Sequence, residues 1–574
     1  MKNTDRKAEV TPRIYECTAI LLFLFAGPLI LFKPAYDYTL VKNITGYLLV
    51  ILLSALFIIR KRNFVFEIKN LIIFLMFFSW ILISSFTAPF GYGAARTLED
   101  YILYLLIFIC AANMDFDRNY LYIWLSAGFI ASLTALVNFI GPRKYAISTF
   151  GNPNFFAGHA IMLLPIAFAM LFIKENTRIK RYILLFFVAI VFLSIIATRS
   201  RAAIFGSLFG VSTLMFLVNN KGMRKWGGYV TIFLAGILSY RQILRWIDTD
   251  IRWYLWRGAL EMIKRRPFTG WGTGNFVFFY PFYRIREYFL RPQATPVTIH
   301  AHNEYLQILS ENGIIGLLLF MGLAIIIIWG SKQKRENVPF ESLLIKGCIA
   351  GIAAVLADNI FSTNLRNPST AMYFWFLMGL SAGKLDKPRE ISFNISRALW
   401  YAIGTAGFVM CVFTSFYRIM PEVYLKRGIW ARDAGDFKTS IDNYLIVCSL
   451  NPYNYEAWYK MAFAHGEAGN LEEARRIYLK INSSIFPHFA KTDANLGAVY
   501  LREGDYERSL YYCKWAEWFN PYDKDILCTI SSIYLMFYND VPHAVSYLNK
   551  VLTIDPKNDY ANRIMNLLRA EGKT

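Results

Sequence analysis

Long apolar stretches recur along the first 420 positions of this 574-residue chain, and they constrain its fold more than any other feature. A helix needs about 20 predominantly apolar residues to cross the roughly 30 Å hydrocarbon layer of a membrane. The thirteen stretches are 14–32, 41–59, 70–87, 100–113, 119–141, 154–174, 180–198, 201–218, 226–240, 312–330, 343–363, 370–384 and 396–418. They predict an all-α, polytopic membrane domain of about 12–13 transmembrane helices.

The lysines and arginines indicate an orientation, because cytoplasmic loops of membrane proteins are enriched in both. Placing the N-terminus inside also places inside the clusters at 60–62, 174–181, 221–225, 332–335 and 384–389. With thirteen spans, the large loop 241–311 and the tail then lie outside the cytoplasm. The net charge of +21 is therefore mostly a topology signal, and no nucleic-acid partner is expected. We expect a membrane domain at 1–418 and a separate domain at 419–574.

The tail carries an internal repeat. Turn pairs recur every 34 to 35 residues at Gly435-Asp436, Gly469-Asn470, Gly504-Asp505 and Asn539-Asp540. This period, with one turn inside each helix pair, resembles the tetratricopeptide family and implies an α-solenoid of about four repeats. Such solenoids present a concave face for binding. We expect recruitment of a protein partner or a substrate, and a stabilising cap on the membrane domain is the alternative.

The large loop combines basic and aromatic residues. Its sequence through Gly313 has ten Lys/Arg and six Asp/Glu, interleaved with Trp, Tyr and Phe. Guanidinium groups match phosphate oxygens, and aromatic rings stack on the apolar faces of sugars. An interfacial aromatic belt with snorkelling arginines has the same composition, so composition alone does not decide between the two.

Four motifs in order favour one family. They are GNPNFFAG at 151–158, TRSRAAIFG at 198–206, RPFTGWGTGNF at 266–276 and HNEYLQILSENGIIGL at 302–317. Together they resemble the O-antigen ligase and O-antigen polymerase superfamily, over roughly residues 15–385. The resemblance implies a GT-C-like membrane domain in the bacterial cytoplasmic membrane, acting in polysaccharide or lipopolysaccharide assembly in the cell envelope.

The resemblance also implies an activity. Members of that family move a glycan from undecaprenyl diphosphate to a hydroxyl on lipid A core, on a growing glycan or on a protein. The transfer inverts the anomeric centre and uses no cofactor and no metal. The family's His-Asn pair falls on His302 and Asn303, and its outer-turn arginines fall on Arg199 and Arg201.

These assignments make physical sense. A lipid-anchored diphosphate must sit at the membrane boundary, where the Arg199 and Arg201 turn would stabilise the leaving group. A neutral imidazole at His302 is suited to take the proton of an acceptor hydroxyl. The alternatives are lipid headgroup anchors for the arginines and a helix cap for His302. His300 is a weaker candidate, because the family pair starts two residues later.

Other residues are candidate substrate contacts: Asn303, Glu304, Tyr305, Arg143, Arg257, Arg265 and Arg266. The triplet Asp248-Thr249-Asp250 matches a metal-binding pattern of other glycosyltransferases, but it is a lone match, and we expect no metal. The glycines of GWGTGNF lie in no strand–helix–strand unit, so we expect them to turn the chain tightly.

The sequence leaves several functions open. Ligase and polymerase reactions share these motifs, and the repeat tail would also suit an oligosaccharyltransferase that modifies protein. A transporter or flippase for lipid-linked glycans is a further alternative. It would place charged residues along the spans, which carry few, with Asp358 an exception near an outer end.

Overall fold

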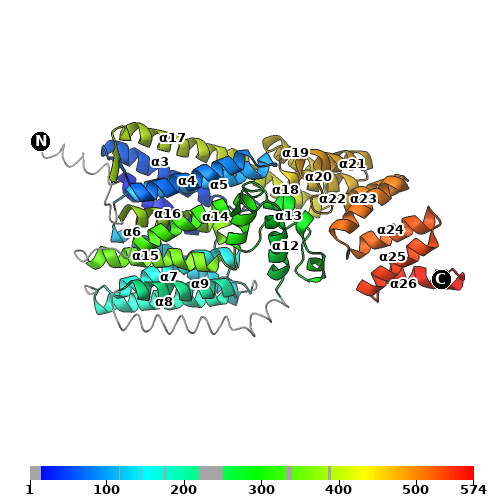
Figure 1. Ribbon diagram of the computed structural model, residues 1–574, viewed down its shortest axis with the longest axis horizontal. Coiled ribbons are helices and arrows are strands. Elements are labelled where there is room, and N and C mark those ends of the chain that lie inside the picture. The colour runs from blue at the N-terminus through cyan, green and yellow to red at the C-terminus, as the bar shows by residue number, and fades with distance from the viewer. Residues whose placement is uncertain are drawn as a thin grey trace. The chain divides into compact units, whose positions relative to one another are not determined.

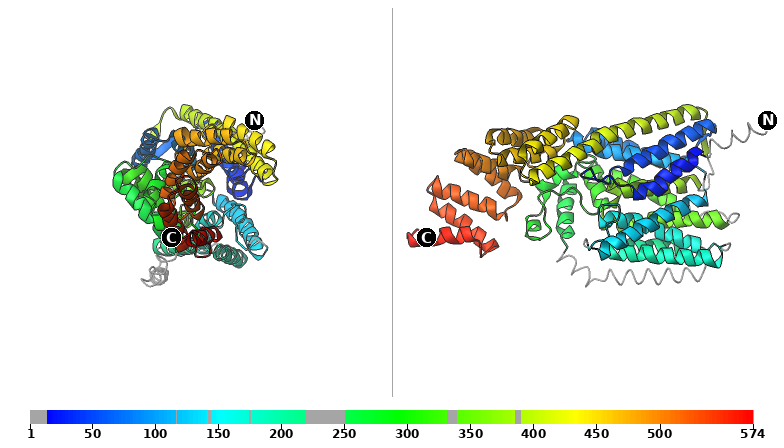
Figure 2. Two further views of the ribbon diagram at one scale, coloured as in Figure 1. Left: turned by 90° about the vertical axis from the view of Figure 1, so that its right-hand side faces the viewer. Right: turned by 180° about the vertical axis from the view of Figure 1, so that it is seen from behind.

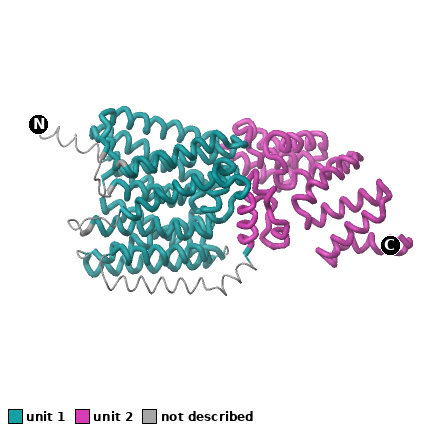
Figure 3. The backbone as a smooth tube through the Cα atoms, in the orientation of Figure 1, with its two compact units in different colours: residues 1–250, 263–276, 300–419 teal, residues 251–262, 277–299, 420–574 magenta. Residues whose placement is uncertain are grey.

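The computed structural model describes residues 14–115, 117–141, 144–173, 176–218, 250–330, 339–384 and 390–573. The chain divides into two compact units (Figure 3). The first contains residues 1–250, 263–276 and 300–419, and the second contains residues 251–262, 277–299 and 420–574. Two segments of the large loop therefore belong to the same unit as the repeat tail.

The first unit is a bundle of long apolar helices that lie side by side (Figure 1). Its helices are η1 (Leu21–Ala26), α2 (Gly27–Leu29), α3 (Lys42–Ile59), α4 (Ile68–Phe86), α5 (Gly91–Asn113), α6 (Arg118–Ile140), α7 (Pro153–Leu171), α8 (Arg178–Ala197), α9 (Arg201–Leu217), α14 (Glu304–Gly330), α15 (Pro339–Asp358), η4 (Asn364–Arg366), α16 (Pro368–Lys384), α17 (Ser396–Thr414) and η5 (Ser415–Ile419). Twelve of the thirteen predicted stretches coincide with these helices. The stretch 226–240 lies outside the described residues.

The described helices fit a multi-pass membrane protein. Seven of them are long and apolar enough to cross a membrane by length and composition, and two shorter apolar helices cover Ile14–Leu29 and Arg201–Leu217. Many apolar side chains on these helices face outward, such as Ile183 and Leu318 at 61% and 63% exposure. Exposed apolar helix faces of this kind are typical of surfaces that contact the hydrocarbon chains of a membrane. The total of 12–13 spans stays a prediction.

A short sheet joins two distant parts of the bundle. Strand β1 (Phe64–Glu67) pairs antiparallel with β2 (Glu390–Phe393), with Phe64 opposite Phe393. The ring of Phe64 packs against Trp400 at 5.1 Å, and Trp400 donates through Nε1 to the carbonyl of Arg62. No pattern in the sequence predicted this sheet, and the other regular elements of the described residues are helical.

The second unit contains the repeats. Its helices are α12 (Arg252–Arg265, shared with the first unit beyond Met262), α13 (Phe276–Tyr283, likewise shared at its first residue), η2 (Arg286–Leu290), α18 (Met420–Asp433), α19 (Phe437–Leu450), α20 (Tyr455–Glu467), α21 (Leu471–Lys480), η6 (Ile481–Ile485), α22 (Thr492–Arg502), α23 (Tyr506–Phe519), α24 (Lys524–Met536), α25 (Val541–Ile554) and α26 (Asp559–Ala570). Pairs α18/α19, α20/α21, α22/α23 and α24/α25 follow one another along the chain (Figure 2).

The repeat turns have one local cause. Gly435, Gly469 and Gly504 adopt positive φ of 79° to 83°, and Asn539 replaces them in the last turn at 50°. The next residue of each turn caps the following helix: Asp436, Asn470, Asp505 and Asp540 accept from a backbone N–H three residues on. A left-handed residue followed by an N-cap ends one helix and starts the next. The predicted tetratricopeptide solenoid is therefore the fold of the tail.

Candidate functional site

The two outer-turn arginines lie on a very short connection. Helix α8 ends at Ala197 and α9 begins at Arg201, so only three residues separate them. Arg199 adopts a positive φ of 58°, which is uncommon for a residue other than glycine and concentrates at functional sites. Its guanidinium lies 5.9 Å from the ring centres of both Phe139 and Tyr145. Arg199 and Arg201 are both exposed.

His302 lies two residues before the start of α14. The helix begins at Glu304, and Oδ1 of Asn303 accepts from the N–H of Leu306 at 3.0 Å, as an N-cap does. His302 is exposed and has a positive φ of 52°. The segment before it is fixed where Ala301 donates to Oε1 of Gln307 at 2.7 Å. His302 therefore lies on a constrained turn directly before the N-terminus of α14.

Both motifs lie at the same end of α15. Gly206 of α9 packs against the last turn of α15, where an added Cβ would lie 3.0 Å from Cβ of Asp358. At the start of α14, the N–H of Glu304 donates to the carbonyl of Asn359 at 3.0 Å, and the hydroxyl of Tyr305 donates to the carbonyl of Leu356 at 2.7 Å. The C-terminal end of α15 thus holds the beginnings of α9 and α14.

The GNPNFFAG motif reaches the same end of the bundle. Asn152 caps α7 by accepting from the N–H of Asn154 at 2.8 Å. Gly158 of α7 leaves room for Asn364, whose Nδ2 would lie 2.7 Å from an added Cβ. The hydroxyl of Thr370 donates to the carbonyl of Phe155 at 3.1 Å. The segment 364–370 therefore connects this motif with the end of α15.

A buried ion cluster involves the first turns of α14, directly after His302 in the sequence. Arg366 Nε donates to Oε1 of Glu304 at 2.8 Å, and its Nη1 donates to Oε2 of Glu311 at 2.7 Å. The side chains of Arg366, Glu304 and Glu311 are 8%, 3% and 3% exposed. Burial alone would lower the pKa of Arg366, but the two carboxylates raise it well above its usual range. Glu304, predicted as a substrate contact, is thus held by Arg366 inside the protein.

Sequence reasoning missed Arg366 and Glu311. Glu311 lies within the HNEYLQILSENG motif but drew no role, and Arg366 is the lone basic residue of the 361–370 connection. A single arginine in a connection otherwise free of positive charge was the available signal. Arg366 Nη2 and Glu304 Oε2 are buried and have no hydrogen-bond partner among the described residues.

His300 differs from His302. Burial, followed by the charges of Arg366, His302 and Arg96, lowers the pKa of His300 to about 3. An imidazole of such low basicity is a weak proton acceptor at neutral pH. His300 is therefore a poor candidate for the general base.

The GWGTGNF motif braces a break in α14. Gly313 interrupts the helix with φ 64° and ψ −171°, which leaves carbonyls of the preceding turn without helical donors. The N–H groups of Trp271 and Gly272 donate to the carbonyls of Ser310 and Glu311, both at 2.9 Å. The predicted tight turning is confirmed, because Gly270, Gly272 and Gly274 have φ of 72°, 98° and 71°.

The remaining basic candidates are dispersed. Arg265 and Arg266 are exposed, and the Arg266 guanidinium stacks 4.4 Å above the ring centre of Trp271. Arg257 is exposed on α12 and belongs to the second unit. Arg143 lies outside the described residues, as does most of the Asp248-Thr249-Asp250 triplet. No group of three or more metal-ligating side chains occurs in the part of the chain that the structure describes.

Charged residues inside the apolar helices are more numerous than the sequence analysis expected. Lys42 is fully buried and donates to the carbonyls of Gly27 and Pro28 at 3.1 and 2.8 Å. Arg418 pairs with Asp100 at 2.5 Å and with Glu99 at 3.6 Å. Each charge is engaged within the bundle, as buried charges need to be.

The bundle, its polar end and the repeat unit define a multi-pass helical membrane protein that carries a tetratricopeptide solenoid. Residues 185–321 match the family model described as O-antigen ligase, so the chain carries an O-antigen ligase domain. The match covers the α8–α9 turn, GWGTGNF and His302, while GNPNFFAG and Arg366 lie outside it.

Solved structures give weaker likenesses. The structure of MamA protein shares 19% identity, with 27% of this chain and 83% of that chain covered, at a TM-score of 0.24. The APC/C hetero-tetramer Cut9-Hcn1 shares 12% identity, with 92% of each chain covered, at a TM-score of 0.25. No curated protein matches the chain. At such TM-scores these likenesses carry no argument, and the solenoid assignment rests on the repeat itself.

Proposed function

We propose that the protein transfers a glycan from undecaprenyl diphosphate to an acceptor hydroxyl, as an O-antigen ligase or polysaccharide polymerase does. The acceptor oxygen forms a bond to the anomeric carbon while the C1–O bond to the diphosphate breaks, with inversion. The hydroxyl proton passes to the imidazole of His302. Arg199 and Arg201 bind the diphosphate and stabilise its developing charge.

One observation carries this proposal. The N-terminal parts of α9 and α14 both contact the C-terminal end of α15. The arginine turn and the His302 turn, which precede these two helices, therefore belong to one polar end of an otherwise apolar bundle. Exposed arginines and an exposed imidazole at such an end can meet the charged head of a lipid-anchored donor, while the lipid tail stays in the hydrocarbon layer.

The buried cluster supports His302 rather than touching substrate. Arg366 fixes Glu304 and Glu311, which lie in the first and third turns of α14. Asn303 caps the same helix. We assign Asn303 and Glu304 a share in holding the His302 turn, and Tyr305 a similar share through its bond to α15. Arg265, Arg266, Arg257 and Arg143 are proposed glycan or phosphate contacts.

The proposal includes a location. The polar end faces the outside of the bacterial cytoplasmic membrane, where lipid-linked glycans are consumed, and the repeat tail lies on the same side. The charge distribution of the loops supports this orientation. The first unit is then the membrane domain, with its boundary to the tail near residue 418.

Two other functions have specific support. The repeat unit would suit capture of a protein acceptor, which favours a protein O-oligosaccharyltransferase of the same superfamily. A transporter for the lipid-linked glycan would use charged residues along the spans. The buried Lys42 and Arg418 are such residues, but both are bonded within the bundle.

Transfer assays on purified protein distinguish these functions. Undecaprenyl-diphosphate glycan and candidate acceptors are supplied with and without a chelator, and product is measured for wild type, His302→Asn, Arg201→Ala and Arg178→Ala. Asparagine tolerates the positive φ of residue 302. Arg178 lies exposed at the opposite end of α8 and is the matched control.

We expect transfer in chelator for wild type and Arg178→Ala, and loss of at least about 100-fold for His302→Asn and Arg201→Ala. Full activity in both of these variants would refute the assignment. Movement of the lipid across a vesicle membrane without glycan transfer would favour the transporter.

A further inference from the structure

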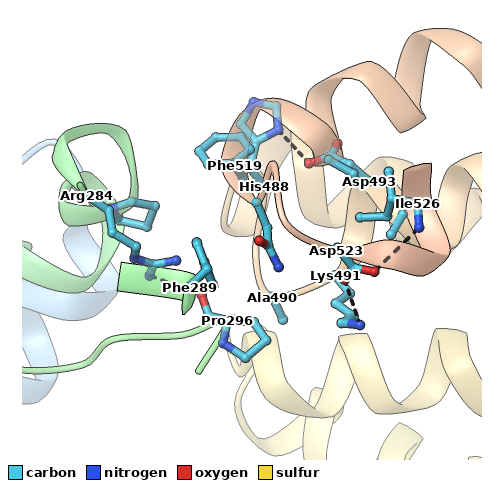
Figure 4. A pocket seen from close by; sticks show the side chains of 14 residues that line it. Arg284, Phe289, Pro296, His488, Ala490, Lys491, Asp493, Phe519, Asp523 and Ile526 are labelled. Carbon is cyan, nitrogen blue, oxygen red and sulfur yellow. Dashed lines mark hydrogen bonds and ion pairs between the residues drawn. The ribbon is translucent and has the colours of Figure 1, made fainter. Parts of the chain in front are cut away.

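A small cavity in the second unit lies between the large loop and the repeats. It has a volume of about 40 Å³ (Figure 4). Its lining consists of loop residues around Arg284 and of several solenoid residues between His488 and Ile526. A single water needs about 10–15 Å³ on this scale, so the cavity admits a few heavy atoms. All of its lining residues belong to the second unit.

Arg284 is a cation without an acidic partner in the part of the chain that the structure describes. Its Nη2 donates to the carbonyl of Pro296 at 3.1 Å and to the hydroxyl of Thr298 at 3.2 Å. Its Nε is buried and has no hydrogen-bond partner among the described residues. No described carboxylate pairs with it, and burial lowers its pKa from the usual value. The guanidinium therefore keeps donors and charge that the protein itself does not satisfy.

Aromatic rings hold the guanidinium in place. Its central carbon lies 5.6, 5.2 and 5.0 Å from the ring centres of Tyr280, Tyr288 and Phe289. Cation–π contact stabilises the charge and fixes the plane of the group without using its N–H donors. Phe289 also lines the cavity, so an apolar ring lies beside the guanidinium donors that remain free.

The other charged groups of the lining are already engaged. Asp493 lies 2.8 Å from Nδ1 of His488 and accepts from Asn482 at 2.8 Å. Asp523 pairs with Lys491 at 3.0 Å and caps α24. The lining therefore offers one unused positive charge beside two carboxylates, and the carboxylates oppose a second negative charge on any ligand.

Part of the cavity lining lies on a strained turn at His488 and Ala490. His488 and Ala490 both adopt positive φ, at 58° and 53°. The His488 ring is held between Trp515 and Phe519, with centroids at 4.8 Å from each. Two such residues in one turn persist only where surrounding contacts fix them, and they concentrate at ligand sites.

From these contacts we propose that the cavity binds the carboxylate of an acidic sugar, a uronic acid unit within a glycan. A carboxylate carries one charge and can accept from the guanidinium N–H donors that the bonds to Pro296 and Thr298 leave free. A dianionic phosphate would meet Asp493 and Asp523. Phe289 and Phe519 line the cavity and can contact the apolar side of the sugar, and the volume fits one carboxylate with the adjoining ring edge. The site does not depend on transferase activity.

Direct binding to the full chain in detergent tests this site. The probes are tetragalacturonate, its carboxyl-reduced neutral counterpart, galactose 6-phosphate and a glutamate-rich peptide, each measured by calorimetry. Arg284→Gln removes the charge, and Arg284→Lys keeps the charge without the planar guanidinium. Ala490→Asn adds bulk at the cavity while tolerating the positive φ. Arg286→Gln, exposed two residues away, is the matched control.

We expect tetragalacturonate to bind at least ten-fold more tightly than the neutral counterpart, with at least ten-fold loss in Arg284→Gln and Ala490→Asn, smaller loss in Arg284→Lys and no change in Arg286→Gln. Thermal unfolding checks that each variant is folded. If Arg284→Gln does not fold, Ala490→Asn and Arg284→Lys decide. Equal binding of the neutral sugar, tighter binding of the phosphate or the peptide, or unchanged binding in Ala490→Asn would overturn the proposal.

Discussion

Two buried arginines in this protein have opposite kinds of partners. Arg366 of the first unit is bonded to two buried carboxylates. Arg284 of the second unit instead packs against aromatic rings and donates to a carbonyl and a hydroxyl, with no carboxylate partner among the described residues. The charge of a buried cation that is paired with carboxylates is neutralised inside the protein. A cation held by rings keeps its charge for a ligand. The first arrangement suits a scaffold, and the second suits a binding site.

Removing Arg366 should have the largest effect on stability. Arg366→Gln leaves Glu304 and Glu311 buried without their cation, and breaking such a pair costs about 3–5 kcal/mol. Thermal unfolding in detergent measures the loss. The triple variant Arg366→Gln, Glu304→Gln, Glu311→Gln removes the unpaired charges and should recover part of it. Equal stability of Arg366→Gln and wild type would show that the cluster is not a scaffold.

Gly313 tests whether the carboxylates depend on the break in α14. Gly313→Ala forces a side chain into positive φ, and its Cβ would lie 2.0 Å from the carbonyl oxygen of Phe268. We expect the free energy of unfolding to fall by about 3 kcal/mol or more, because the backbone strain and the steric collision add. Gly435→Ala is the control in the repeat unit. It has a similar positive φ but open space around it, so only about 1 kcal/mol is expected.

Arg284→Gln should change stability least. The substitution gives up cation–π contacts of about 0.5–2 kcal/mol, but it also removes an unpaired charge from a partly buried position. We expect a net change of about 1 kcal/mol or less in the unfolding of the second unit. A loss as large as that of Arg366→Gln would show that Arg284 is structural, and the contrast between the two arginines would fail.

The sequence predicted the features that repeat or that have a fixed local pattern. The turns at Gly435-Asp436 and its equivalents identify the solenoid because each contains a left-handed residue and a helix cap. Apolar length identifies the helices of the bundle in the same way. The glycines of GWGTGNF also indicated a tight turn, although not the helix that the turn braces.

Features made by distant contacts were not predictable in this way. Arg366 meets Glu304 across 62 positions, and β1 pairs with β2 across more than 300. Neither contact leaves a local pattern. The start of α14 at Glu304 is likewise not specified by HNEY alone, because the capping role of Asn303 depends on the backbone geometry. The Arg199, Arg201 and His302 roles remain predictions.

In the proposed reaction, His302 accepts the acceptor's proton while Arg201 holds the diphosphate. Single-turnover transfer with saturating donor separates these two roles in wild type, His302→Asn and Arg201→Lys. We expect a chemical step at least about 100-fold slower in His302→Asn, with donor Kd unchanged within about two-fold. Arg201→Lys should instead weaken donor binding. A chemical step of wild-type rate in folded His302→Asn would show that His302 is not the base.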